Sequence, residues 1–98
     1  MAAKGYWVVT MDVNDAAQYG RYQAFVAPFL AASDGRFVVR GGRHEIVEGE
    51  ARSRQIVVEF PSYEQALSVY RSAAYQQGMQ DRIQSSIADF VIVEGAGH

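Results

Sequence analysis

Four stretches of the chain are rich in aromatic and β-branched residues and predict β-strands. They are Gly5–Val13, Arg36–Arg40 with its continuation through Gly41-Gly42 into Arg43–Val47, Arg54–Phe60 and Asp89–Glu94. The paired glycines indicate a bulge or bend within the second strand. The polar segment 48–53 separates the second strand from the third and predicts a hairpin connection.

The first helical region follows the first strand. It begins near Asn14 or Asp15, which are both favourable N-cap residues, and it ends at the turn formed by Asp34 and Gly35. Apolar residues recur inside this region at helical spacing, and we expect them to face the core. These residues are Tyr19, Tyr22, Val26, Phe29 and Leu30.

The second helical region begins at Ser62, directly after Pro61, and Gln65 stands at capping-box spacing from this serine. Its apolar face consists of Ala66, Leu67, Val69 and Tyr70. The segment Ser72–Tyr75 predicts a break in the helix. We expect the helix to resume after the break, through Met79, Ile83 and Ile87.

The resulting element order, β-α-β-β-α-β, predicts a ferredoxin-like α+β fold. In this fold a four-stranded antiparallel sheet carries both helices on one face. The chain has 98 residues, of which 49% are hydrophobic. We therefore expect a single domain over residues 1–98 with enough apolar side chains to form a core.

The predicted strands carry more apolar surface than two helices on one face can cover. An antiparallel sheet with one wet face alternates apolar and polar residues. Here Tyr6, Val8 and Val57 fall on the face opposite the helices, and the fourth strand is apolar on both faces. Soluble monomers rarely expose such a patch. We therefore predict a homodimer, an α+β barrel in which two copies pack sheet to sheet.

The same uncovered face carries a few polar side chains. By strand alternation they are Thr10, Asp12, Arg40, Gln55 and Glu59. A mostly apolar surface with a few convergent polar groups is typical of a small-molecule pocket. Arg40 and Glu59 can equally form a buried ion pair that holds a dimer together. The pattern leaves both interpretations open.

An ordered set of short motifs along the whole chain resembles the DUF1330 family, a domain family of unknown function. The motifs are Tyr6-Trp7 with Asp12, Arg36–Arg43, Glu48-Gly49, Glu59–Ser62, Ala66 with Tyr70–Ser72, Tyr75-Gln76 and Asp89–Gly95. The resemblance implies a ferredoxin-like protomer of the dimeric α+β barrel superfamily. It implies no agreed activity, because relatives on this fold include cofactor-free monooxygenases, haem-binding enzymes, lactone isomerases and ligand-binding regulatory modules.

Glu59 and Asp12 are the candidates for acid–base chemistry. We expect the ends of neighbouring central strands to bring the two carboxylates close together on the apolar face. Burial there would raise a carboxyl pKa and favour a general base. Arg40 is a candidate for binding a substrate carboxylate or for stabilising an oxyanion.

The predicted ligand-binding residues are Tyr6, Arg40, Glu59, Ser72 and Tyr75. Ser72 and Tyr75 belong to this set because they flank the predicted helix break, and a break can aim a side chain at a ligand. The alternative interpretation is that the break only fits the two helical segments around the sheet.

The composition argues against several classes of protein. The chain has no cysteine, which excludes disulfides, thiolate zinc sites and cysteine nucleophiles. Nine basic and eleven acidic residues give a net charge of −2, without the basic excess that nucleic-acid binding requires. The two histidines, His44 and His98, lack partners at metal-ligand spacing, so we expect no metal and no cofactor. His44 is the only candidate for a haem ligand.

No apolar run is long enough to span a membrane, and the N-terminus lacks the pattern of a signal peptide, so we expect no membrane partner and a cytoplasmic location. The leading functional hypothesis is a homodimer with a pocket for a small organic molecule. Its enzymatic version is metal-free chemistry of the proton-transfer or oxygenase type. The alternative hypothesis is a non-catalytic dimerisation or sensing module without a ligand pocket.

Overall fold

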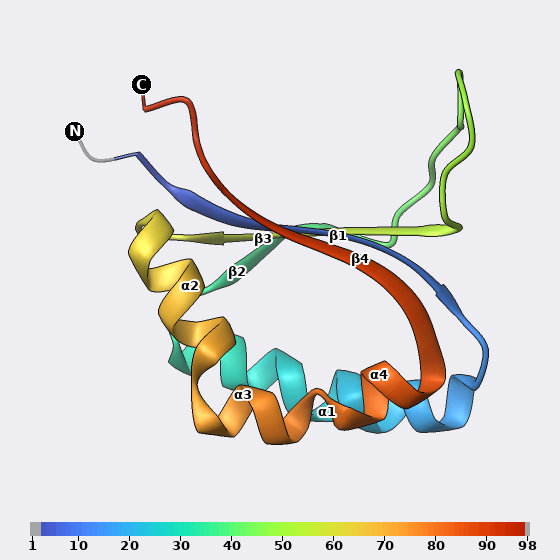
Figure 1. The fold of residues 1–98 in the computed structure, drawn as a ribbon, viewed down its shortest axis with the longest axis horizontal. Coiled ribbons are helices and arrows are strands. Elements are labelled where there is room, and N and C mark those ends of the chain that lie inside the picture. Colours follow the sequence, from blue (N-terminus) through green and yellow to red (C-terminus); the bar gives the residue numbers. More distant parts are fainter. Residues whose placement is uncertain (1–2, 98) are drawn as a thin grey trace.

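The computed structural model describes residues 3–97, and it places all four helices on one face of a single antiparallel sheet (Figure 1). The elements are β1 (Gly5–Val13), α1 (Ala16–Ala32), β2 (Arg36–Arg40), β3 (Arg54–Phe60), α2 (Tyr63–Arg71), α3 (Ala73–Gly78), α4 (Gln80–Ser85) and β4 (Ser86–Glu94). The strand order in the sheet is β2-β3-β1-β4. This is the ferredoxin-like arrangement, so the predicted fold class is confirmed.

Helix α1 begins and ends where its polar residues predict. The Asp15 side chain accepts a hydrogen bond from the Gln18 amide at 3.0 Å, which satisfies one of the free N–H groups of the first turn. At the other end Asp34 takes the left-handed conformation with φ of 63°. Gly35 follows because its α-carbon lies against the Phe60 ring, where a β-carbon would collide.

The second helical region consists of three short helices. Ser62 caps α2 by accepting from the Gln65 amide, as predicted, but the Gln65 side chain donates to the Ser33 carbonyl instead of completing a capping box. Ser72 interrupts the helix, and its hydroxyl accepts from the Tyr75 amide to cap α3. The predicted continuation of the helix to Ile87 is wrong, because β4 begins at Ser86.

The core lies between the sheet and the helices and is centred on Trp7 of β1. Its ring centroid lies 5.0 Å from that of Phe60 and 4.9 Å from that of Tyr75. The indole N–H donates to the Ala66 carbonyl at 2.9 Å, which ties α2 to the sheet. All three aromatic side chains are fully buried, so burial and this hydrogen bond fix where α2 and α3 cross the sheet.

Strand β2 is shorter than predicted, and its irregularity lies three residues before the glycine pair at which the sequence suggested it. Residues 43–47 form no strand and lie exposed in the connection between β2 and β3. The ladder between β2 and β3 shifts between Phe37, which pairs with Val58, and Val39, which pairs with Val57. The bulge therefore lies at Val38 and not at Gly41-Gly42.

The sheet face away from the helices is apolar along its centre. Val8 stands between Val57 of β3 and Val91 of β4 in the two ladders, and Val91 and Val93 are about half exposed in the protomer. The segment 41–53 projects from the sheet on this same side (Figure 1). Among the described residues, no helix is long and apolar enough to cross a membrane.

Candidate functional site

A narrow cavity lies inside the protomer, between the inner face of the sheet and the helices. Its walls are mainly apolar and include Trp7, Val9, Val26, Leu30, Val58 and Phe90. Its volume is about 20 Å³, which has room for about one water molecule. Three arginines, Arg40, Arg54 and Arg82, also line it.

Arg40 lies on the inner face of the sheet, so its predicted position on the uncovered face is wrong. The bulge at Val38 reverses the alternation of β2, and Arg40 therefore pairs with Ile56, whose side chain is buried against the helices. Its guanidinium stacks on the Phe37 ring, 4.2 Å from the centroid. Arg40 is the exposed member of the three and lies at the rim of the cavity.

Arg54 enters the cavity from the start of β3, on the same face as Ile56 and Val58. Its guanidinium lies 5.6 Å from the centroid of the Tyr19 ring, and its Nε has no hydrogen-bond partner. The guanidinium packs directly over Gly41, where a β-carbon would collide with it. Gly41 has φ of 65°, so glycine is required there both for its backbone conformation and for the room it leaves.

Arg82 reaches the cavity from α4 and is the most deeply buried of the three, with 5% of its surface exposed. Its guanidinium lies over the rings of Phe90 and Tyr22, at 5.1 and 5.7 Å. One Nη contacts the sulfur of Met79 at 3.8 Å, and Nε has no partner. The aromatic faces attract the cation, but they leave a strong hydrogen-bond donor unsatisfied.

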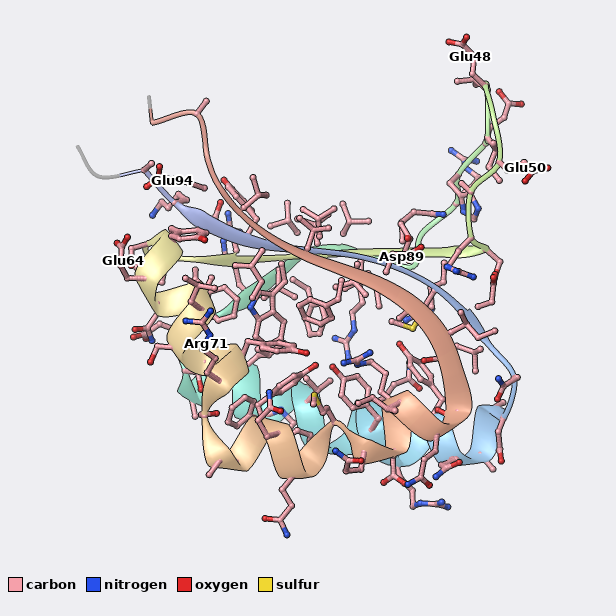
Figure 2. The ribbon with its side chains drawn as sticks, viewed as in Figure 1. Glu48, Glu50, Glu64, Arg71, Asp89 and Glu94 are labelled. Atoms are coloured by element: carbon pink, nitrogen blue, oxygen red, sulfur yellow. The ribbon has the colours of Figure 1, made fainter. Side chains whose placement is uncertain are left out.

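The acidic residues all lie outside this cavity. None of the eleven is buried and none lines it. Figure 2 shows the labelled examples at the periphery, with Glu48 and Glu50 on the projecting connection and Glu64 and Glu94 at the opposite end of the molecule. Within residues 3–97, Arg40, Arg54 and Arg82 form no ion pair. The cavity is therefore cationic inside a chain of net negative charge.

Two tyrosine hydroxyls meet beside the arginines. The hydroxyls of Tyr22 and Tyr75 are 2.7 Å apart in the buried core. Burial raises the pKa of Tyr22, and it also raises the pKa of Tyr75 despite the opposing effect of the nearby Arg82. Both phenols therefore remain protonated and supply hydrogen-bond donors, not negative charge.

The structure does not bring the five predicted ligand-binding residues into one pocket. Ser72 caps α3, Tyr75 is a fully buried core residue that contacts Trp7, and neither lines the cavity. Tyr6 and Glu59 lie on the outer face of the sheet, and only Arg40 lines the cavity. The helix break at Ser72 therefore does not direct Ser72 or Tyr75 into this cavity.

Glu59 is held as a carboxylate in a small polar cluster on the outer face. It accepts hydrogen bonds from Arg36 Nε at 3.0 Å and from the Tyr6 hydroxyl at 3.1 Å. These contacts, the Arg36 bond first, hold the pKa of Glu59 below its ordinary value. The expected raised pKa is therefore wrong, and the partner of Glu59 is Arg36 and not Arg40.

Asp12 lies at the other end of the sheet from Glu59. Strands β1 and β3 run antiparallel, and their register pairs Tyr6 with Glu59 and Met11 with Arg54, so the expected proximity of the two carboxylates is wrong. Asp12 accepts from the Ser53 amide at 2.8 Å and from Arg52 at 3.1 Å. These bonds, the Ser53 amide first, lower the pKa of Asp12.

The described residues contain no group of three or more histidine, cysteine, aspartate or glutamate side chains that could hold a metal ion. His44 lies in the exposed connection between β2 and β3, with Nδ1 3.1 Å from the Gly42 carbonyl oxygen. The other histidine, His98, lies outside the described residues.

The sequence analysis did not identify Arg54 and Arg82 as site residues, although the sequence position of each indicates an inward-facing side chain. Arg54 shares the parity of Ile56, Val58 and Phe60, which marks it as inward-facing. Arg82 follows Met79 by three residues, so it lies on the buried stripe of its helix. An arginine at an apolar position of a strand or helix was the feature to notice.

Residues 4–96 match a family model described as Domain of unknown function (DUF1330). No curated protein is significantly similar to the chain in sequence. A protein of unknown function from Rhodopseudomonas palustris, RPA0582, has a similar structure, with a TM-score of 0.75 at 15% identity over 96% of this chain and 83% of that one.

Two further solved structures share the fold. One is SnoaB, a cofactor-independent oxygenase from Streptomyces nogalater, with a TM-score of 0.62 at 16% identity over 94% of this chain and 92% of that one. The other is an antibiotic biosynthesis monooxygenase candidate from Caulobacter crescentus, with a TM-score of 0.61 at 8% identity over 97% and 92% of the two chains. At these identities the likeness shows the fold alone.

Proposed function

The chain belongs to the DUF1330 family, and from its interior geometry we propose that it binds a small organic molecule in the cavity between sheet and helices. The observation that carries this proposal is the set of polar atoms left without a partner inside an apolar cavity. Arg54 and Arg82 each line it with a buried, unpartnered Nε. Buried donors are nearly always satisfied in folded proteins, so an unsatisfied pair facing one cavity favours a bound partner there. The 20 Å³ present holds only about one water molecule, so an organic ligand binds only if the cavity widens, and its exposed rim at Arg40 is where this can happen.

The cavity supports binding better than proton transfer. None of its lining residues is a carboxylate or a histidine, and the two carboxylates predicted as bases lie on the outer face of the sheet. The tyrosines beside the cavity stay protonated and are poor bases. An enzyme of the metal-free oxygenase type remains a prediction for this chain, to be tested by oxygen consumption once a ligand is known.

We also propose that the functional unit is a homodimer formed through the outer face of the sheet. The centre of this face is apolar, with Val8 flanked by Val57 and Val91. Charged side chains of this face are paired within the protomer at the two ends, by the Arg36–Glu59 pair and by the Arg52 pairs with Asp12 and Asp89. An apolar centre with a polar rim is the usual anatomy of a protein interface.

The test of the binding proposal is capture of a small molecule from a metabolite mixture, read by native mass spectrometry. Gln23 lines the cavity and is half-buried, so Gln23→Trp should block the cavity. Gln77→Trp makes the same change at an exposed position that does not line the cavity, and it is the matched control.

We expect the wild-type protein and Gln77→Trp to retain a bound molecule and Gln23→Trp to lose it. Retention by all three proteins would place the binding site elsewhere and overturn the cavity assignment. No bound molecule in the wild-type protein would favour the alternative, a dimerisation module without a ligand.

A further inference from the structure

We propose that the ligand of this cavity is a small organic carboxylate whose charged end is bound by Arg40, Arg54 and Arg82. This inference rests on the small-molecule function proposed above and adds the charge and chemical class of the ligand. The three guanidinium groups come from β2, β3 and α4, and they converge on one cavity that no acidic side chain lines.

Arg82 carries the argument because it is almost completely buried without an anionic partner. Moving a guanidinium out of water is costly unless an opposite charge and good hydrogen bonds replace the water. Among the described residues Arg82 has no acidic partner, and its contacts are a methionine sulfur, two aromatic faces and the neutral hydroxyl of Tyr75, while its Nε has no partner. A carboxylate in the cavity would supply the negative charge and several acceptor positions at once.

The tyrosines do not provide this charge internally. Tyr22 lines the cavity and its hydroxyl contacts that of Tyr75, but both phenols remain protonated. One of the two hydroxyls donates to the other, so the pair adds at most one free neutral donor to the cationic set. The charged side chains that line the cavity are all donors, and they complement a ligand that accepts.

The apolar walls of the cavity favour an organic anion over an inorganic one as the ligand. Trp7, Val26 and Phe90 would contact the part of the ligand beyond its charged end. An apolar body gains from burial against these side chains, whereas a fully hydrated inorganic anion would only lose water there. The exposed Arg40 stacks on Phe37 at the rim, and we infer that this side chain moves aside when a ligand larger than a water molecule binds.

The experiment compares a carboxylate with a neutral amide of the same shape. Benzoate and benzamide form one pair, and acetate and acetamide form a smaller pair. Binding is followed by the fluorescence of Trp7, the only tryptophan of the chain and a lining residue of the cavity, and by the thermal midpoint. We expect saturable binding of a carboxylate and at least about tenfold weaker binding of its amide, because the amide lacks the charge.

Two variants test the residues, and one matched control accompanies them. Arg82→Met and Arg54→Met each remove a guanidinium but keep an apolar side chain, and each should weaken carboxylate binding by about tenfold or more. We also expect Arg82→Met to be at least as stable as the wild-type protein without ligand, because an unpaired buried cation is gone. Arg71→Met removes an exposed arginine that does not line the cavity and should change nothing.

Equal binding of amide and carboxylate, unaffected by Arg82→Met and Arg54→Met, would overturn the charge assignment and leave the small-molecule function standing. Recovery of a neutral molecule in the metabolite capture would likewise overturn the charge assignment and leave the small-molecule function standing. No binding of either carboxylate, together with a loss of stability in both variants, would show that the arginines are structural and overturn this inference. The proposed function itself falls only if metabolite capture also yields nothing.

Discussion

Asp12 and Glu59 are anchored residues, and their pKa values are lowered by the bonds they accept. The Ser53 amide is the main cause for Asp12, and the Arg36 hydrogen bond is the main cause for Glu59. A carboxyl group with a lowered folded-state pKa stabilises the fold at pH values above its ordinary pKa. That contribution disappears as the pH falls through the folded-state value. At the scale of single residues, both side chains are therefore carboxylates that stabilise the fold, and neither has the raised pKa expected of a general base.

This assignment predicts a shallower acid dependence of stability in Asp12→Asn. We expect the variant to be less stable than the wild-type protein at neutral pH. The difference should begin to decrease near the ordinary pKa of 3.8 and vanish as the pH falls through the lower folded-state pKa. The measurement is the free energy of unfolding by urea across about pH 7 to 2. Glu45→Gln, on the exposed connection, is the control and should follow the wild-type curve. Parallel curves for wild-type and Asp12→Asn would contradict the assignment.

At the scale of elements, the parts of the chain with local signals were predictable from the sequence. Asp15 and Ser62 cap their helices as their residue types indicate. The failures lie where pairing between distant segments decides. Residues 43–47 have a strand-like composition but no partner strand, and Ile87 has helical spacing but pairs with Asp12 in the β1–β4 ladder. Backbone hydrogen bonds to another strand override a local pattern.

Gly41 directly follows β2 and packs against Arg54, a side chain that lines the cavity. Its φ of 65° is unfavourable for other residues, and a β-carbon there would collide with the Arg54 guanidinium. We expect Gly41→Ala to lower the free energy of unfolding by about 1–3 kcal/mol. Gly42→Ala is the matched control, because a β-carbon at this neighbouring position has open space. Equal stability of the two variants in chemical denaturation would show that Gly41 is not constrained.

At the scale of the whole molecule, the proposed binding site lies on the opposite side of the sheet from where strand alternation placed it. Counting by twos assigned Arg40 to the outer face, and the bulge at Val38 moved it to the inner one. Nothing in the side chain of Val38 marks it as a bulge, so this reversal could not be read from the pattern. Of the residues predicted for the site, only Arg40 lines the cavity, and the two candidate carboxylates lie outside it.

If the binding site lies inside the protomer as proposed, the outer face of the sheet is left for the proposed dimer contact. Val91 is 55% exposed at the centre of this face, and Ile83 is 48% exposed on α4 in the helical layer. We expect light scattering of the wild-type protein to give about twice the mass of one chain. Val91→Glu should shift the protein towards the monomer, because a charge in an apolar interface is desolvated without a partner. Ile83→Glu is the matched control and should leave the dimer intact, since the helices cover the other face (Figure 1). A clean monomer of the wild-type protein at micromolar concentration, or an equal effect of the two variants, would refute the sheet-to-sheet dimer.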